Sequence, residues 1–252
     1  MKDIYFGDTI KGFPLVLVHG FLGSSEVWSL QIKYLRNSYR LITPDLPGFG
    51  KSNKAQYCNS IECMARSVIN YLDKKEIKKF YLLGHSMGGM VVQEMSKILG
   101  NRISKLICYG TGPIGNIPGR FETMDVSRAK LKKDGLDLTI NRIARNWFIK
   151  KEKAKYFSLC FNEGKKASPE AVDAALIAMR DWRGIDNLKN INNRTLIIWG
   201  DQDKAYNYKQ VETLKKNIAK SELIIFKDHA HNVHLESPNS FNECVKNFLS
   251  DE

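Results

Sequence analysis

The sequence lacks any apolar run long enough to cross a membrane. Its longest apolar stretch, from Pro14 to Phe21, is far shorter than the ~20 residues that a membrane-spanning helix needs. Acidic Asp3 and Asp8 interrupt the N-terminal segment, where a signal peptide has an unbroken apolar core. We therefore expect a cytoplasmic protein without a membrane span.

Cysteine is scarce, and its spacing fits neither a disulfide framework nor a zinc site. The five cysteines are scattered and contain no C-x-x-C pair: Cys58, Cys63, Cys108, Cys160 and Cys244. Free thiols are the prediction. Cys63, Cys108 and Cys244 lie within apolar patterns and are predicted to be small core residues. We expect no metal and no cofactor.

Low-complexity segments and repeats are absent, which favours a folded globule. With 252 residues, 43% hydrophobic and 26% charged, the composition excludes disorder, collagen and coiled coil. The net charge is +12, from 39 Lys and Arg against 27 Asp and Glu. These cations are dispersed, without a DNA-reading motif or a basic run interleaved with aromatics. The charge therefore indicates a solvated surface rather than a nucleic-acid partner, and the oligomeric state stays open.

Short apolar runs alternate with amphipathic segments of helical length, which predicts an α/β fold with a mostly parallel sheet. The runs do not alternate in polarity, as is typical of strands buried on both faces. The predicted strands are Leu15–His19, Arg40–Thr43, Phe80–Leu83, Lys105–Tyr109, Thr195–Trp199 and Glu222–Phe226. The predicted helices are Val27–Asn37, Ser60–Lys74, Met87–Leu99, Tyr208–Ala219 and Asn239–Leu249.

One long segment interrupts this alternation. No strand pattern occurs between Tyr109 and Thr195, but apolar residues at helical spacing occur from Ile140 to Phe148 and from Val172 to Trp182. A structureless loop of this length is uncommon. We predict a helical lid over residues 113–184, inserted into a core formed by residues 1–112 and 185–252.

The strongest motif is G-H-S-M-G-G at residues 84–89. It follows an apolar strand and opens a helix, so it has the G-x-S-x-G pattern of a nucleophile elbow. The tight turn strains Ser86 and leaves no room for side chains at Gly84 and Gly88. It also leaves the Met87 N–H at a helix N-terminus, free to donate to an oxyanion.

Three further motifs follow strands. H-G-F-L-G-S at residues 19–24 offers a second oxyanion donor, the Phe21 N–H. Residues 199–203, W-G-D-Q-D, place two carboxylates at the end of a strand, and either one can orient an imidazole. The segment from Asp228 to Pro238 holds three histidines. The chain order is therefore Ser, Asp, His, as in α/β-hydrolases.

These four motifs, from His19 to Pro238, resemble the α/β-hydrolase superfamily, and the resemblance covers essentially the whole chain. It implies that the acid is Asp203, the second aspartate of G-D-x-D, and that the base is His231. It implies a parallel sheet flanked by helices, with a cap inserted between two strands. Two departures are present: Ala230 stands where the family has a glycine, and the proline common after G-D-x-D is missing.

The resemblance implies an enzyme, a serine hydrolase acting on a small-molecule ester, lactone or thioester. The lidded C–C bond hydrolases and the menaquinone-pathway lyase are alternatives that use the same triad. That lyase family has an arginine after S-M-G-G, where this sequence has Met90. A similarity to 3-oxoadipate enol-lactonases lies in the segment from Ala174 to Ile191. A non-catalytic receptor on the same fold is a third alternative, which the intact Ser, Asp and His disfavour.

The predicted lid is basic. It holds 15 Lys and Arg against 9 Asp and Glu, so it carries +6 of the chain's +12. This excess indicates a solvated outer face; the alternative is that it steers an anionic substrate into the pocket. For that alternative the predicted substrate-binding residues are Arg180, Arg183 and Trp182, which adjoin an apolar helix face; an arginine there binds a carboxylate bidentately.

Overall fold

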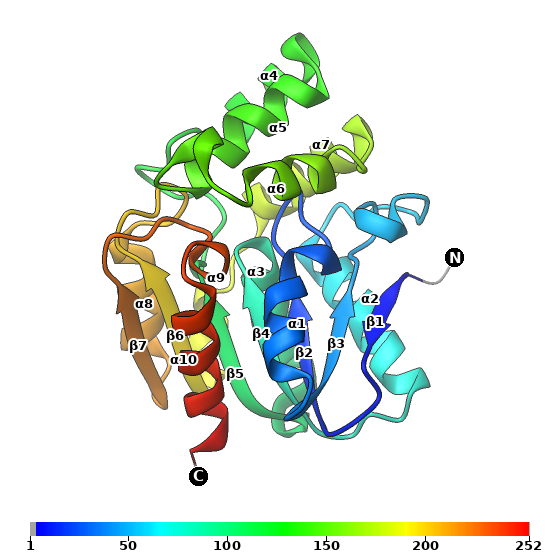
Figure 1. Cartoon of the computed structure of the whole chain (residues 1–252), viewed down its shortest axis with the longest axis vertical. Helices are drawn as coiled ribbons and strands as arrows, with labels where there is room; N and C mark the ends of the chain where they lie inside the picture. Colours follow the sequence, from blue (N-terminus) through cyan, green and yellow to red (C-terminus); the bar gives the residue numbers. More distant parts are fainter. Residues whose placement is uncertain (1–3, 252) are drawn as a thin grey trace.

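The computed structural model describes residues 4–251, so Asp3 lies outside the described residues. Its centre is a seven-stranded sheet in the order β1-β3-β2-β4-β5-β6-β7 (Figure 1). All neighbouring strands are parallel except β1 and β3. The strands are β1 (Phe6–Asp8), β2 (Phe13–Val18), β3 (Tyr39–Pro44), β4 (Phe80–His85), β5 (Ile103–Tyr109), β6 (Arg194–Gly200) and β7 (Ser221–Phe226). The predicted fold class is therefore confirmed.

Both faces of the central strands are buried, which explains their unalternating apolar residues. The edge strand β7 is only partly buried, so the prediction of burial on both faces is wrong for this strand. In β2, Leu15 and Leu17 join one hydrophobic cluster, whereas Val16 and Val18 join another. The first cluster lies under α1 (Ser29–Leu35) and α10 (Pro238–Ser250). The second lies under α2 (Ile61–Lys74), α3 (Met87–Leu99) and α8 (Tyr208–Asn217).

Two local features differ from the prediction. Strand β1 was not predicted, because three residues are too few to carry a periodicity. The predicted helix Val27–Asn37 is α1, and a 3-10 turn stabilised by the Ser24 side chain precedes it. The 3-10 turns are η1 (Ser25–Trp28), η2 (Gly50–Ser52), η3 (Gly100–Arg102), η4 (Arg145–Trp147), η5 (Lys151–Lys153) and η6 (Ile185–Asn190).

A helical insertion between β5 and β6 lies above the carboxyl ends of the strands (Figure 1). It contains α4 (Met124–Asp134), α5 (Leu136–Ala144), α6 (Phe157–Gly164) and α7 (Pro169–Asp181). The two ends of the insertion are tied together, since Gly115 N donates to Trp182 O at 3.1 Å and Gly184 N to Pro113 O at 2.8 Å. The division into a core and a lid at residues 113 and 184 stays a prediction.

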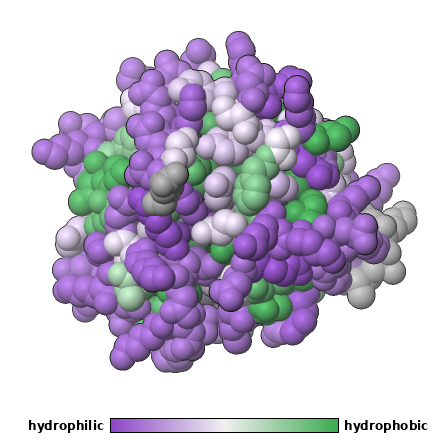
Figure 2. Space-filling view, turned by 90° about the horizontal axis from the view of Figure 1, so that it is seen from below, coloured by the Kyte–Doolittle hydropathy of each residue, from purple (hydrophilic) through white to green (hydrophobic). Residues whose placement is uncertain are grey.

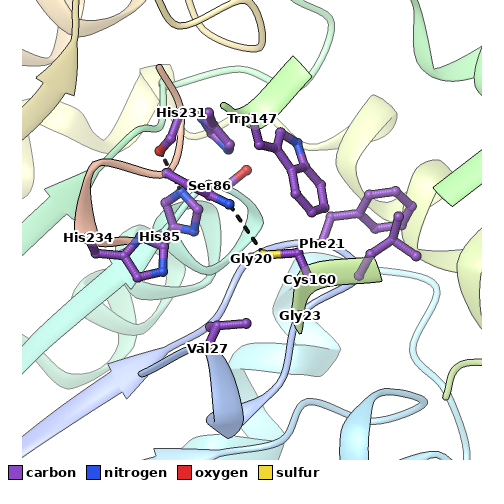
Figure 3. Close-up of a pocket in the computed structure, with 12 residues that line it drawn as sticks. Gly20, Phe21, Gly23, Val27, His85, Ser86, Trp147, Cys160, His231 and His234 are labelled. Atoms are coloured by element: carbon purple, nitrogen blue, oxygen red, sulfur yellow. Dashed lines mark hydrogen bonds between the residues drawn. The ribbon is translucent and has the colours of Figure 1, made fainter. Parts of the chain in front are cut away.

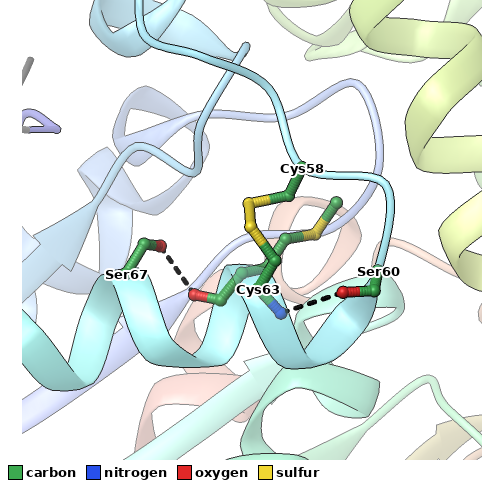
Figure 4. The surroundings of a disulfide bond; sticks show 5 residues. Cys58, Ser60, Cys63 and Ser67 are labelled. Atoms are coloured by element: carbon green, nitrogen blue, oxygen red, sulfur yellow. Dashed lines mark hydrogen bonds between the residues drawn. A yellow bond between two sulfur atoms is a disulfide. The ribbon is translucent and has the colours of Figure 1, made fainter. Parts of the chain in front are cut away.

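The prediction of free cysteines is wrong for one pair. Cys58 and Cys63 form a disulfide at the start of α2 (Figure 4). The Ser60 side chain accepts a hydrogen bond from Cys63 N, and this N-cap turns the chain back so that the two Cα atoms lie 5.7 Å apart, within the range of a disulfide. Cys63 is exposed and is no core residue. Cys108 is buried as predicted, and Cys244 is partly buried.

No helix in residues 4–251 is long and apolar enough to span a bilayer. Figure 2 shows the face opposite the insertion, where hydrophilic residues predominate and hydrophobic ones form small separate patches. That face therefore presents no broad apolar surface.

Candidate active site

Ser86 stands on a sharp turn between β4 and α3. Its backbone adopts φ 56° and ψ −118°, a region that non-glycine residues rarely occupy. The Ser86 N–H donates to Tyr109 O on the neighbouring strand at 2.9 Å, which fixes the turn. A Cβ on Gly84 would lie 2.2 Å from the Gly88 carbonyl oxygen, so a side chain has no room there. The turn has the geometry expected from the motif.

The carboxyl ends of β6 and β7 bring an acid and an imidazole together. Asp203 Oδ2 lies 2.7 Å from His231 Nδ1, and both side chains are buried. The other carboxylate oxygen of Asp203 accepts the amides of Ala205 and Tyr206 at 2.7 and 3.1 Å. Asp201 instead accepts the Asp228 N–H at 2.8 Å and shapes a turn. Of the two aspartates, only Asp203 can orient His231.

Ser86 and His231 line the same cavity (Figure 3). Its floor includes the loop after β2, and the insertion contributes Trp147 and Cys160. Burial raises the pKa of the Cys160 thiol to about 12, so this cysteine is a neutral wall residue and no competing nucleophile. The cavity therefore combines the Ser86 hydroxyl, the imidazoles of His85, His231 and His234, and largely apolar walls.

The backbone amides of Phe21 and Met87 stay a prediction as oxyanion donors. The Met87 amide is the first of α3, and the Phe21 amide lies in the loop after β2; neither donates to an acceptor within residues 4–251. A Cβ on Gly20 would lie 3.0 Å from the Ser86 Cβ, which shows how closely this loop approaches Ser86. His19 holds the loop with both ring nitrogens, at 2.8 Å from Gly20 O and 2.9 Å from Leu46 N. It is a structural histidine.

A buried network of aromatic side chains holds the backbone carbonyl of His231. The His231 carbonyl accepts the Tyr109 hydroxyl at 2.9 Å and lies 3.2 Å from His85 Nε2. His234, in α9 (Val233–Glu236), lies 3.0 Å from the Tyr109 hydroxyl through Nδ1. Burial lowers the pKa of His85 well below its usual range and that of His234 to about 3. His229 is partly exposed and does not line the cavity, whereas His231 and His234 both do. Of these two, within residues 4–251 only His231 is hydrogen-bonded to a carboxylate, that of Asp203.

Tyr206 is a site residue that the sequence motifs did not single out. Its ring lies nearly parallel to the His231 imidazole, with centroids 5.8 Å apart and planes 15° from parallel. Burial raises the pKa of the Tyr206 hydroxyl to about 12. The positive charge of Arg120 and the interactions of the hydroxyl with Ser86 and Thr111 make this rise smaller. Only its place three residues after Asp203 could have drawn attention to it.

The predicted substrate-binding residues of the insertion do not line the cavity beside Ser86 in the described part of the chain. Arg180 forms ion pairs with Asp125 at 2.8 Å and Asp181 at 2.7 Å. The Trp182 indole donates to Glu94 Oε2 at 3.3 Å, and Arg183 is exposed beside a separate cavity. The helical spacing predicts that these side chains face the pocket, but Arg180 at the end of α7 contacts Asp125 of α4, and Trp182 contacts Glu94 of α3.

A family model of the alpha/beta hydrolase fold matches residues 14–238. The chain belongs to this family. The match includes the elbow of Ser86, the loop of Asp203 and the loop of His231, and it confirms the resemblance inferred from the motifs. The protein is therefore an α/β-hydrolase enzyme.

Relatives of this α/β-hydrolase are named for different substrates. A pimeloyl-acyl-carrier-protein methyl ester esterase of Legionella pneumophila is 28% identical over 95% of this chain and 96% of its own. A 2-hydroxy-6-oxononadienedioate/2-hydroxy-6-oxononatrienedioate hydrolase of Comamonas testosteroni is 26% identical over 98% of this chain and 91% of its own. Among solved structures, an esterase from Exiguobacterium antarcticum has a TM-score of 0.91 and 26% identity, covering 98% of this chain and 96% of its own.

Proposed function

We propose that this α/β-hydrolase is a serine hydrolase that cleaves a small-molecule carboxylic ester, lactone or thioester through Ser86, His231 and Asp203. The observation that carries the proposal is the 2.7 Å contact between His231 and Asp203 beside a cavity that also holds the strained Ser86. A carboxylate on one imidazole nitrogen fixes the tautomer in which the other nitrogen accepts a proton.

The proposed reaction has two steps. Ser86 Oγ attacks the carbonyl carbon while His231 Nε2 takes its proton, and the Phe21 and Met87 amides donate to the oxyanion. His231 then returns the proton to the leaving group, which leaves an acyl-enzyme. In the second step His231 deprotonates a water, which attacks the acyl carbon and releases the carboxylic acid and Ser86.

Labelling with a fluorophosphonate tests the nucleophile. We expect one adduct, on Ser86, by mass spectrometry, and a loss of at least about 10³-fold in kcat for Ser86→Ala. The matched control is Ser96→Ala, a buried serine of α3 whose hydroxyl donates to Gln93 O and which lies outside the cavity. Labelling that survives Ser86→Ala would falsify the proposal.

The second candidate is hydrolysis of a carbon–carbon bond by the same residues, favoured by the relative from Comamonas testosteroni. The lyase alternative is disfavoured because Met90 is fully buried in the core, where that family has an arginine. Turnover of p-nitrophenyl esters of increasing chain length, measured beside a dienoate substrate for C–C cleavage, separates the two reactions. A kcat/KM at least tenfold higher for the dienoate would favour the second candidate.

A further inference from the structure

A buried carboxylate of the insertion contacts the loop that carries the Phe21 amide. Glu163 lies in α6, and its Oε2 atom accepts the Ser24 hydroxyl at 2.6 Å. Ser24 is fully buried, and Glu163 is only 5% exposed. A hydrogen bond from a hydroxyl to a carboxylate is strong where water is excluded. This contact therefore joins the insertion to the loop after β2, across 139 residues of sequence.

The turn around Phe21 is strained. Gly23 N donates to Gly20 O at 3.1 Å, which closes a tight turn with Phe21 and Leu22 at its centre. Leu22 adopts φ 58°, in the left-handed region that costs a leucine free energy. Such a conformation persists only where the surrounding contacts hold it. The direction of the Phe21 N–H, one of the two proposed oxyanion donors, therefore depends on these contacts.

Ser24 is the point at which the insertion holds this turn. The next residue is held by the core, because Ser25 N donates to Asp45 Oδ1 at 2.5 Å. The Ser24 Oγ accepts Glu26 N at 3.1 Å and so begins η1, while its single proton goes to Glu163. Without the carboxylate, that proton would be a buried donor with no acceptor, and the hydroxyl would lose its fixed direction.

Helix α6 places two functions on one of its faces. Cys160, one helical turn before Glu163, lines the cavity together with Phe21 (Figure 3). The other oxygen of the Glu163 carboxylate is 2.6 Å from Lys166 Nζ, which compensates its charge. The position of α6 therefore sets both a wall of the cavity and the acceptor for Ser24.

We propose that Glu163 is a positioning residue, which acts through Ser24 to hold residues 20–24 (the oxyanion loop) in the conformation that stabilises the oxyanion. The inference rests on the proposed function and adds a control by the insertion. When α6 is in place, Ser24 has its acceptor and the strained turn is held. When α6 moves away, the turn relaxes and the Phe21 amide no longer points to the oxyanion.

Substitutions at both ends of the contact test this role. Glu163→Ala and Ser24→Ala should each lower kcat at least about tenfold and change KM less than about twofold, because an oxyanion donor acts in the transition state. Glu163→Gln keeps the size of the side chain and an oxygen that can accept the hydroxyl, so it should lose less. The double variant should lose no more than the worse single variant, since both changes break one contact.

Ser127→Ala is the matched control, because the insertion contains a second contact of the same chemistry. The buried Ser127 hydroxyl donates to Glu122 Oε1 at 2.5 Å, and Glu122 also pairs with Lys130 at 2.6 Å. Ser127 lies in α4 and does not line the cavity beside Ser86. Ser127→Ala should lower the free energy of unfolding as Ser24→Ala does, with kcat unchanged. An equal fall of kcat in both variants would overturn the proposal.

Inhibitors give a readout specific to the oxyanion. A trifluoromethyl ketone forms a hemiketal with the nucleophilic serine, and its oxygen then occupies the oxyanion position. We expect Glu163→Ala to raise the inhibition constant of this ketone at least about tenfold, and that of the matching methyl ketone less than about twofold. An equal change for both inhibitors would assign Glu163 a structural role in the pocket and overturn the proposal.

Hydrogen exchange separates this inference from the proposed function, because it needs no turnover. The amides of Gly23, Ser25 and Glu26 are hydrogen-bonded in or beside the oxyanion loop. We expect them to exchange at least about tenfold faster in Glu163→Ala and at the wild-type rate in Ser127→Ala. If no ester is cleaved but this pattern holds, Glu163 holds the loop and the serine-hydrolase proposal fails. If esters are cleaved but exchange in Glu163→Ala is unchanged, the inference fails.

Discussion

At the residue scale, Tyr206 contacts every member of the proposed triad. Its amide donates to Asp203 at 3.1 Å, its ring lies over the His231 imidazole and its hydroxyl interacts with Ser86. The indole of Trp199 donates to its carbonyl at 2.8 Å and so fixes its backbone. Since its pKa is about 12, the hydroxyl keeps its proton at neutral pH and stays a donor.

We therefore expect Tyr206→Phe to reduce kcat about fivefold to tenfold, because the lost polar interaction of the hydroxyl with Ser86 is worth about 1 kcal/mol. KM should change less than kcat, since the hydroxyl faces the nucleophile. Steady-state kinetics with a p-nitrophenyl ester measures both. Tyr208→Phe, at an exposed tyrosine two residues further on, is the control. A kcat within twofold of the wild type would assign Tyr206 to packing alone.

At the scale of elements, Glu236 joins the insertion to the loop of His231. Its carboxylate accepts Ile149 N at 2.7 Å from the insertion and Ala230 N at 2.8 Å from the residue before His231. Asn232 N also donates to Trp147 O, at 3.0 Å. The wall of the cavity and the imidazole proposed as the catalytic base thus share one anchor.

Glu236→Gln should remove one contact, because one backbone amide would then face a donor instead of an acceptor, and weaken the other, because the remaining oxygen is no longer charged. We expect the free energy of unfolding to fall by about 2 kcal/mol and kcat/KM to fall about tenfold. Urea unfolding and ester kinetics measure these effects, and hydrogen exchange should show faster exchange at residues 145–150. Glu243→Gln, on the exposed side of α10, is the control. If Glu243→Gln lowers the free energy of unfolding and kcat/KM by the same amounts, the two hydrogen bonds of Glu236 do not explain the losses.

At the scale of the whole molecule, three buried histidines set the stability in mild acid. Burial lowers the pKa of His19, His85 and His234 below the usual 6.5. Between pH 6.5 and these lower values, the unfolded chain binds protons that the folded protein does not. Stability therefore rises with pH in that window and is lost as the pH falls below 6.5.

We expect the free energy of unfolding to decrease steadily from pH 6.5 to pH 5, with each histidine contributing up to about 1.4 kcal/mol per pH unit. Urea unfolding at half-unit steps of pH measures the slope. His234→Phe keeps an aromatic ring but removes one titrating group, so its slope should be shallower. Equal stability at pH 6.5 and pH 5 would contradict this account.

The sequence by itself determined the features that depend on short stretches of chain. Buried strands, the helix from Met87 to Leu99 and the turn of Ser86 are local, because steric strain and periodicity act over a few residues. The order of the four motifs also indicated the family. Parallel strands end at one edge of the sheet, so their order sufficed to bring Asp203 and His231 together.

Only the tertiary structure decided what depends on packing between distant segments. It placed Tyr206 over His231, paired Arg180 with acids and joined Glu163 to Ser24. It also added β1 to the sheet and joined Cys58 to Cys63. Sequence spacing places a residue on a helix, but the packing of helices and loops decides which side chains it contacts. The effect of a charged side chain on a ligand likewise depends on packing, because a neighbouring opposite charge can compensate it.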